Sequence, residues 1–290
     1  MSVSRLSGKT TAGSISEFIA RTSLRTIPRA VRDQANLHVL DGLATMVGGA
    51  KEESSRILRR HCLAPVQGFA ATVLGAPGKF SAEHAALVNG LQGHALDYDD
   101  AQATTLASRP AGQQTHPTAP VLAAALALAE SRRLPGAALL VSYIAGVEVA
   151  CRLGDAVDPS HYLDGFHPTG TLGVFGAAAA CATLLKLAPQ SIRHALGIAG
   201  TLASGLRANR GTMAKALNAG HAAANGVLAA RLAAGGFTAS QNIFDDPMGL
   251  FRAMSRDQPD RSLLRFGEPF FLAVPGVAFK LYPCAGVMHP

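Results

Sequence analysis

Apolar residues recur along most of this chain at the spacing of an α-helix. A first row follows Pro28, stops at a pair of glycines, and consists of Val31, Ala35, Val39, Leu43 and Val47. Proline suits the first turn of a helix and glycine interrupts it, so this row predicts one helix. Similar patterns predict helices over residues 118–132, 136–154, 171–186, 189–203 and 218–235. These Ala- and Leu-rich segments lack the alternation of strands and indicate an all-α fold of the helical-bundle kind.

Two stretches depart from this pattern. Residues 68–80 (GFAATVLGAPGKF) combine a short β-prone run with an Ala-Pro-Gly turn, which predicts a small extended excursion rather than a sheet. Ser81 then predicts the N-cap of a helix through AEHAALVNGLQGHALDY, with His84 in reach of the capping-box position. From residue 263 onward, β-branched and aromatic residues among Gly and Pro indicate that a helical domain (1–262) is followed by the start of a mixed α/β domain (263–290). So short a segment either packs on the helices or is part of something longer.

Composition refines this picture. Hydrophobic residues make up 48% of the chain and aromatic residues only 6%, so the abundant Ala and Gly predict helices that approach each other closely. The four cysteines form no CxxC pair, and we find no signal peptide and no apolar run of the ~18 residues that a membrane span needs. We therefore expect a cytoplasmic protein without structural zinc. The formal charge is +7, but the basic residues are scattered, which makes nucleic acid the weakest of the possible anionic partners.

One segment concentrates positive charge among small residues. RANRGTMAKALNAGHAAANG contains Arg207, Arg210, Lys215 and His221 and is otherwise almost wholly Gly, Ala and Asn. Residues this small cannot cover four potential cations, so the segment predicts a place where an anion binds. Alternatively, Lys215 extends its ammonium group to solvent from a buried helix start.

Polar residues interrupt the apolar frame at three other places. In HALDYDD, His94 and Asp97 are three residues apart, which places them on one face near a helix end. In THPTAP and GFHPTGT, His116 and His167 each precede a proline-started helix, whose N-terminus favours an anion. Each motif alone also fits a turn, a cap or a solvated helix end, and the carboxylates suit a divalent cation. The metal alternative is weaker, because the histidines lie in separate segments without HExxH spacing.

Six motifs occur in a fixed order: VNGLQGHALDYDD, THPTAPVLAAALALAE, GVEVACRLG, GFHPTGTLGVFGAAAA, ASGLRANRGTMAKALNAGHAAANGVLAARLAAGGFTA and FKLYPCAGVMHP. Together they resemble the MmgE/PrpD family over roughly residues 14–290. That family includes 2-methylcitrate dehydratase, cis-aconitate decarboxylase and an iminodisuccinate epimerase. The resemblance implies a large all-helical domain with a smaller α/β lid domain, a homodimer, and no cofactor or metal.

The resemblance also implies an active site. It is expected to be lined by Asp97, His116, His167 and Lys215, with Lys280 contributed from the lid side and Arg207 as a further carboxylate clamp. The implied substrates are small di- or tricarboxylates, which undergo proton transfer at a carbon next to a carboxylate or imine. Lysine and arginine would hold the carboxylates and the two histidines would carry protons, with the acid and the base not assigned.

Two departures from the family bear on these expectations. Many relatives read Lys-Pro-Leu-His and then Arg, where this chain has Lys215, Ala, Leu, Asn218 and then His221, which bears on substrate identity. The chain is also much shorter than family members, so most of the lid is expected to be missing. The leading hypothesis is a dehydratase-like lyase, preferred to a decarboxylase or an epimerase-type isomerase. The alternatives are a catalytically inactive helical interaction module and, more weakly, a nucleic-acid-binding protein.

Overall fold

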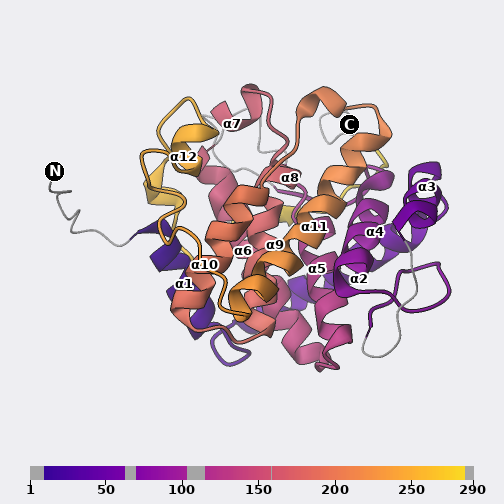
Figure 1. Ribbon diagram of the computed structural model, residues 1–290, viewed down its shortest axis with the longest axis horizontal. Helices are drawn as coiled ribbons and strands as arrows, with labels where there is room; N and C mark the ends of the chain where they lie inside the picture. The colour runs from indigo at the N-terminus through magenta and orange to yellow at the C-terminus, as the bar shows by residue number, and fades with distance from the viewer. Residues whose placement is uncertain (1–9, 63–69, 103–114, 158, 285–290) are drawn as a thin grey trace, which may run out of the picture.

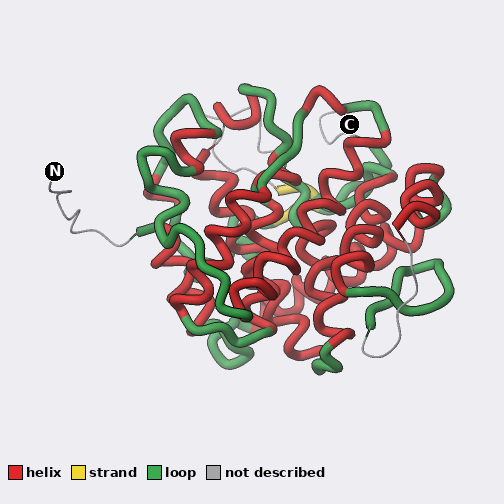
Figure 2. The backbone as a smooth tube through the Cα atoms, in the orientation of Figure 1, coloured by secondary structure: helices red, strands yellow, loops and turns green. Residues whose placement is uncertain are grey.

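The computed structural model describes residues 10–62, 70–102, 115–157 and 159–284, which are mostly α-helical. Figures 1 and 2 show one body of helices with loops at its periphery. The longer helices are α1 (Thr11–Arg21), α2 (Arg29–Gly49), α3 (Glu53–Cys62), α4 (Ala82–Ala95), α5 (Thr118–Ser131), α6 (Gly136–Val157), α9 (Gly173–Leu184), α10 (Pro189–Leu202) and α11 (Met213–Ala234). The short elements are α7 (Ser160–Leu163), α8 (Pro168–Thr171), α12 (Leu250–Ala253), the 3₁₀ turns η1 (Arg207–Asn209) and η2 (Arg261–Leu263), and the strands β1 (Ala101–Gln102) and β2 (Val277–Ala278). The all-α prediction is confirmed.

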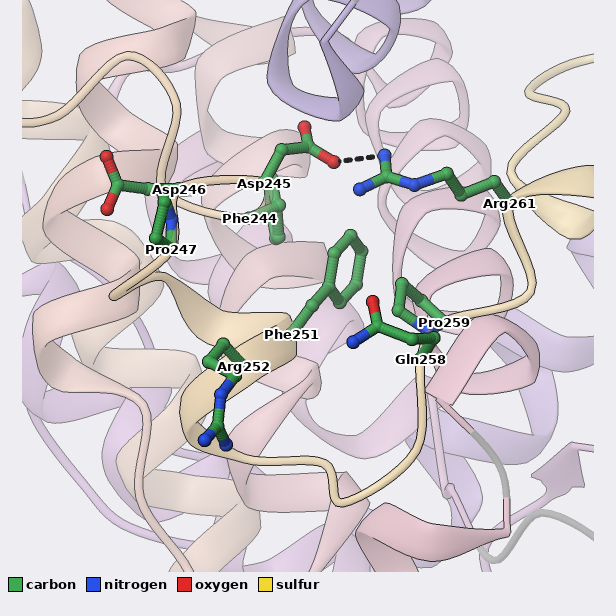
Figure 3. Close-up of a pocket in the computed structure, with 9 residues that line it drawn as sticks. All are labelled: Phe244, Asp245, Asp246, Pro247, Phe251, Arg252, Gln258, Pro259 and Arg261. Atoms are coloured by element: carbon green, nitrogen blue, oxygen red, sulfur yellow. Dashed lines mark hydrogen bonds and ion pairs between the residues drawn. The ribbon is translucent and has the colours of Figure 1, made fainter. Parts of the chain in front are cut away.

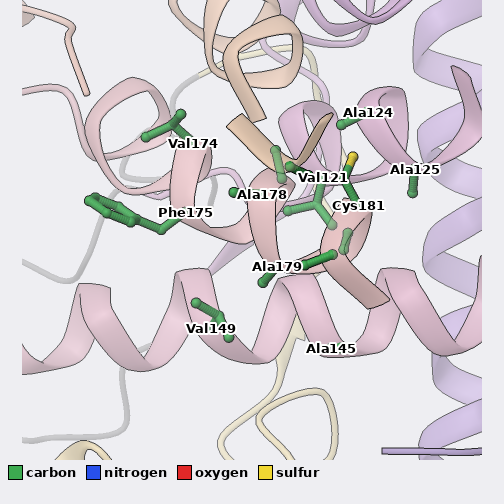
Figure 4. Packing of buried hydrophobic residues seen from close by; sticks show 14 of the residues in the cluster. Val121, Ala124, Ala125, Ala145, Val149, Val174, Phe175, Ala178, Ala179 and Cys181 are labelled. Carbon is green, nitrogen blue, oxygen red and sulfur yellow. The ribbon is translucent and has the colours of Figure 1, made fainter. Parts of the chain in front are cut away.

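The core is built around α9, against which α5, α6, α10 and α11 pack. Figure 4 shows how small the side chains between these helices are: alanine and valine predominate, and Phe175 is a large exception. Gly146 of α6 faces Gly176 of α9, and a Cβ atom added to Gly146 would lie 2.6 Å from the Gly176 carbonyl oxygen. Only glycine permits such an approach. The helices therefore pack as closely as the composition predicts.

The central helix α6 is long and apolar enough to meet the length and composition criteria for a membrane span. In this fold, 72% of its most apolar window is buried inside the protein, where α6 packs on α9 and α5. Packing in the core therefore accounts for its apolar character.

The predicted helices correspond to observed ones with shifted ends. The helix predicted over 171–186 is in two pieces, α8 and α9, and the helix predicted from 218 begins at Met213. Ser81 caps α4 as predicted, because its hydroxyl oxygen accepts the backbone N–H of His84 at 3.2 Å. That helix ends at Ala95, earlier than predicted. The predicted helices do not include α1 or α3.

The row of apolar residues on α2 does not face the core throughout. Val31 and Ala35 are buried, whereas Val47 at the far end is 58% exposed. The reason is geometric: a step of four residues overshoots one helical turn by about 40°, so four steps rotate the row by about 160° around the helix. The prediction of the helix is confirmed, and its row of apolar residues turns from the core toward solvent along the helix.

The first of the two segments predicted to be irregular pairs with itself, and the second packs on another part of the chain. In the stretch 68–80, Ala71 and Phe80 form an antiparallel bridge, and residues 68 and 69 lie outside the described residues. In the C-terminal stretch, Phe270, Phe271 and Leu272 are buried. The backbone N–H groups of Gly267 and Phe271 donate to the buried carboxylate of Glu148 on α6. The C-terminal segment thus packs on the helical body as far as residue 284.

Candidate functional site

The chain turns sharply just after α4. Asp97 has φ = 50°, a left-handed conformation that Asp tolerates better than most residues. This turn separates the side chains of His94 and Asp97, which the spacing of three predicts on one helix face. His94 points to Asp99, whereas Asp97 points to two lysines. The prediction of a shared helix face is wrong because α4 ends at Ala95, between the two residues.

Asp97 joins two lysines that are far apart in the sequence. Its Oδ1 atom lies 3.0 Å from Nζ of Lys215, in the first turn of α11, and 2.7 Å from Nζ of Lys280. The Lys280 ammonium group also donates to the Asp97 carbonyl oxygen at 2.8 Å. Burial by itself raises the pKa of Asp97, but the hydrogen bond from Lys280 and the charge of Lys215 outweigh it and hold the pKa below its ordinary value. Asp97 is therefore an anion that gathers two cations.

Lys280 is held in place by the segment that carries it. β2 pairs antiparallel with β1, which follows directly after the aspartates of the HALDYDD motif. Phe279 stacks on His38 of α2 with ring centroids 4.1 Å apart. The Tyr98 hydroxyl donates to the Leu281 carbonyl oxygen at 3.1 Å. Three contacts around Lys280 thus fix its approach to Asp97, and its side chain is only 3% exposed.

Three buried histidines lie together behind this charged group. The ring centroid of His94 is 4.7 Å from that of His116 and 5.6 Å from that of His167. The His116 backbone N–H donates to Thr169 Oγ1, and the His167 backbone N–H donates to the Gly205 carbonyl oxygen. The three imidazoles therefore meet although they come from different elements: the end of α4, the segment before α5 and the N-cap of α8.

The environment keeps these imidazoles neutral at pH 7. The pKa of His94 and of His116 is lowered to about 3, chiefly by burial and in addition by the charges of Lys215 and Lys280. Burial also lowers the pKa of His167 to about 3, with the neighbouring His94 as the next cause. A neutral imidazole has one ring nitrogen with a free lone pair and one N–H donor, so it can accept or relay a proton.

The four cations of the RANRGTMAKALNAGHAAANG segment do not stay together. Arg207 stacks over the Tyr162 ring at 3.5 Å and donates to the Tyr162 carbonyl oxygen. Arg210 donates to the Tyr162 hydroxyl, and His221 contacts Ser204 and Asn225. Of the four, only Lys215 forms an ion pair in the described part of the chain with a residue predicted for the site. The structure thus gathers Asp97, His116, His167, Lys215 and Lys280, and it places Arg207 against Tyr162.

A divalent cation is the obvious alternative occupant. One ligand atom each of His94, Asp99 and His116 lie within 4.8 Å of one another, which suits a metal. The electrostatic potential at these residues disfavours a bound metal ion. Lys215 and Lys280, which disfavour a proton on His94 and His116, also disfavour a dication. The chemistry of the donor set permits a metal, and the charge around it favours an anion.

A separate pocket lies among the loops around α12. Figure 3 shows it lined by Phe244, Phe251 and charged residues, with Arg261 paired to Asp245. Asp245 also accepts hydrogen bonds from the backbone and side chain of Thr11. The pocket shares no residue with the histidine and lysine cluster. Because its central carboxylate already has three donors, this pocket is the weaker candidate site.

Comparison with known proteins gives this geometry a context. Residues 13–262 match the model of the MmgE/PrpD N-terminal domain. The chain belongs to the MmgE/PrpD family. It is 32% identical over 251 residues to a human cis-aconitate decarboxylase, covering 84% of this chain and 50% of the relative. The corresponding Aspergillus terreus protein is 31% identical over 277 residues, covering 91% of this chain and 55% of the relative. This MmgE/PrpD chain thus spans about half the length of the curated relatives it matches.

Two further residues contact the histidines of the cluster, although neither is among the residues predicted to line the site. Asp99 binds His94, and Asn218 lies with its side-chain amide nitrogen 3.0 Å from Nδ1 of His167. Asp99 is five residues after His94, a spacing that no helix or strand brings together, so only the turn at Asp97 reveals the pair. For Asn218, the available signal is its departure from the family pattern, one helical turn after Lys215.

Proposed function

We propose that this chain carries the polycarboxylate site of a lyase that needs no cofactor and transfers a proton at a carbon next to a carboxylate. The observation that supports it most is the convergence of Lys215 and Lys280 on Asp97 beside three buried, neutral histidines. Small carboxylates need cations for binding, and carbon acids need a proton carrier. The cluster contains both in one place.

Each group has a distinct role in this proposal. The two ammonium groups bind substrate carboxylates and stabilise the negative charge that develops on the reacting carbon. Lys280 donates to both the carbonyl oxygen and the carboxylate of Asp97, whereas Lys215 pairs with the carboxylate alone and is more exposed, at 19%. Lys215 is therefore the first group that a substrate meets. His116 and His167 carry the proton, a role that typically contributes ~100-fold to 10,000-fold in rate.

The reaction that we expect first is decarboxylation. The relatives from human, Aspergillus terreus and mouse are cis-aconitate decarboxylases, the mouse protein being 30% identical over 257 residues. In such a reaction, the substrate loses CO₂ from one carboxylate and gains one proton on carbon, so a single proton donor balances the step. Dehydration of a 2-methylcitrate-like substrate, preferred from the sequence, stays a prediction. It uses the same two kinds of group, cations for carboxylates and a proton carrier beside carbon.

Activity of the unaltered 290-residue chain can be measured with three candidate substrates. Cis-aconitate, 2-methylcitrate and iminodisuccinate are each incubated with the protein, and loss of substrate and formation of product are followed by proton NMR. We expect turnover of one of them. Lys215→Ala is expected to lower kcat/KM by roughly 100-fold or more without lowering the melting temperature, because the lysine is partly exposed and does not fill the core.

Arg210→Ala is the matched control. It removes a cation from the same segment, where the Arg210 side chain donates to the Tyr162 hydroxyl and its charge is the smallest of the influences on the pKa of His167. We expect its kcat/KM to stay within a few-fold of the unaltered protein. Absence of turnover of all three substrates would favour the inactive helical module. Equal losses in the two variants would show that net charge, rather than the cluster, determines activity.

A further inference from the structure

Asp99 contacts two histidines of the cluster at once. Its Oδ2 and Oδ1 atoms lie 2.8 and 3.0 Å from Nδ1 of His94. The same Oδ2 atom lies 3.5 Å from Nδ1 of His116. Asp99 and His94 are each 1% exposed, so solvent does not compete for these contacts. One buried carboxylate therefore stands between two imidazoles that come from different helices.

The first contact determines which nitrogen of His94 carries the proton. An ionised carboxylate can only accept hydrogen bonds, so Nδ1 of the neutral His94 ring must donate to it. Nε2 of His94 then bears the lone pair. That atom is buried and has no hydrogen-bond partner within the described ranges. An unpaired buried nitrogen in a cluster of this kind needs an explanation, and a substrate group or a transferred proton supplies one.

The second contact is different in kind. Nδ1 of His116 is also buried without a hydrogen-bond partner in the described structure, although the Asp99 carboxylate is only 3.5 Å away. At that separation, the neutral ring gains little from the carboxylate. A ring that has taken up a proton is a cation with N–H groups on both nitrogens, and it gains a charge-assisted hydrogen bond from a small movement.

A proton on His116 needs a nearby negative charge, because the other charges around it are positive. Lys215 and Lys280 both disfavour a positive charge on His116, and burial disfavours it more. Asp99 is the group whose charge acts in the opposite direction on His116. Without Asp99, a proton on the buried His116 would face two lysines.

We infer that Asp99 is a positioning residue that holds His94 in its Nδ1–H tautomer and stabilises the imidazolium that His116 becomes when it takes up a proton. This inference rests on the proposed function, because it assigns a role within the same site. Asp99 is two residues from Asp97 in sequence, but the two carboxylates act on different groups. Asp97 forms ion pairs with the two lysines, and Asp99 contacts the two histidines.

The kinetic test compares two neighbouring, equally buried carboxylates. Asp99→Asn keeps the size of the side chain and removes its charge. We expect kcat to fall by about 100-fold or more with KM within threefold, since Asp99 acts through the histidines and not on the substrate. Asp100→Asn is the matched control. The Asp100 carboxylate contacts His38 and Thr118 rather than the histidine cluster, so we expect this variant to have a lower melting temperature and a kcat within a few-fold of that of the unaltered protein.

A second measurement does not depend on turnover. In ¹⁵N-histidine NMR spectra at pH 7, His94, assigned by its loss in His94→Asn, is expected in the Nδ1–H tautomer. Asp99→Asn is expected to populate the Nε2–H tautomer, because its amide can donate to Nδ1. The Tyr143 hydroxyl lies 2.6 Å from the Thr118 hydroxyl that donates to Asp100, so Tyr143→Phe provides a milder control on the Asp100 side if Asp100→Asn does not fold.

The outcomes separate this inference from the proposed function. Normal kcat in a folded Asp99→Asn protein would overturn the inference and leave the lyase intact. An unchanged His94 tautomer in that variant would overturn it too. If the unaltered chain turns over no substrate, the proposed function fails, and the NMR comparison still decides whether Asp99 sets the state of His94.

Discussion

Asp99 and Asp100 are consecutive, completely buried, and each lies 2.8 Å from a histidine Nδ1. Their remaining contacts differ. Asp100 also accepts the backbone N–H of Thr118 at 3.3 Å and its hydroxyl at 2.5 Å, and that hydroxyl lies 2.6 Å from the Tyr143 hydroxyl. Asp99 instead lies beside a second histidine nitrogen that has no hydrogen-bond partner among the described residues.

This difference separates a structural from a functional carboxylate. Asp100 satisfies the first turn of α5, where backbone N–H groups would otherwise lack partners, and both the N–H and the hydroxyl of Thr118 donate to it. Among the described residues, Asp99 accepts no hydrogen bond from a helix end and instead faces two imidazoles of the cluster, those of His94 and His116. The two residues have the same type, the same burial and the same distance to one histidine. Their other partners distinguish them: Thr118 for Asp100 and His116 for Asp99.

The largest effect on stability is expected on the Asp100 side. Asp100→Ala removes the cap of α5 and leaves His38 and Thr118 without their buried partner, so we expect the free energy of unfolding to fall by about 3–5 kcal/mol. Urea unfolding followed by circular dichroism measures it. Thr118→Val in the same background is expected to cost less than in the unaltered protein, because the two residues share one interaction. Additive losses would contradict the network.

Acid is expected to destabilise the protein through the Asp99 side. The folded-state pKa values of His94, His116 and His167 are about 3, against 6.5 for an ordinary histidine. Between these values the unfolded chain binds protons that the folded chain does not, so stability falls as pH falls. Each histidine contributes a slope of up to about 1.4 kcal/mol per pH unit. Burial raises the pKa of Asp99 from 3.8 to about 6. Between these values the folded chain binds a proton that the unfolded chain does not, so this carboxyl stabilises the fold as pH falls.

His161 and His221 also have lowered pKa values and act like these three histidines, whereas Asp41 and Glu148 have raised pKa values and act like Asp99. The five histidines outweigh the three carboxyls, so we expect the melting temperature to fall from pH 7 to pH 5. His116→Gln should show a shallower fall, because one titrating group is gone. A melting temperature that is constant over this range would mean that the imidazoles titrate normally, and the neutral-histidine site would then be wrong.

The smallest effect is expected at the far end of the Asp100 network. Tyr143→Phe removes the hydroxyl that contacts Thr118 and leaves the completely buried ring in place. We expect the free energy of unfolding to fall by about 1 kcal/mol, the usual net value of such a hydrogen bond. Activity should not change. A loss of activity as large as that of Asp99→Asn would mean that the two carboxylates form one functional unit, and the distinction between them would fail.

Much of the fold follows from local pattern. The spacing of apolar residues predicts α2, α5, α6, α10 and α11, because burial of one face of a helix leaves a period in the sequence. Helix α1 is not among the predicted helices, although Ala12, Ile15 and Ile19 have the spacing of one helix face and are buried. Its N-cap is Thr10, whose hydroxyl oxygen accepts the Gly13 N–H. The helix predicted from residue 171 begins earlier, at Pro168, and is interrupted at Leu172.

The site is predictable in part, on different grounds. His116 and His167 are marked by a proline directly after each, and Lys215 by its small neighbours. Arg207 has the same marks as Lys215 but lies against Tyr162, a partner 45 residues away that no local pattern indicates. A carboxylate clamp at Arg207 stays a prediction, and its guanidinium group is already engaged by Tyr162.

The helical architecture, the close packing through Ala and Gly, the family, and the residue types available for chemistry all follow from the amino-acid sequence, because they depend on short-range spacing and composition. Which of those residues meet depends on the tertiary structure. Lys280 reaches Asp97 across 183 residues through the pairing of β2 with β1. The turn at Asp97 directs Asp99, rather than Asp97, to His94. Such contacts depend on how whole elements pack, and residues distant in sequence carry no period that would reveal them.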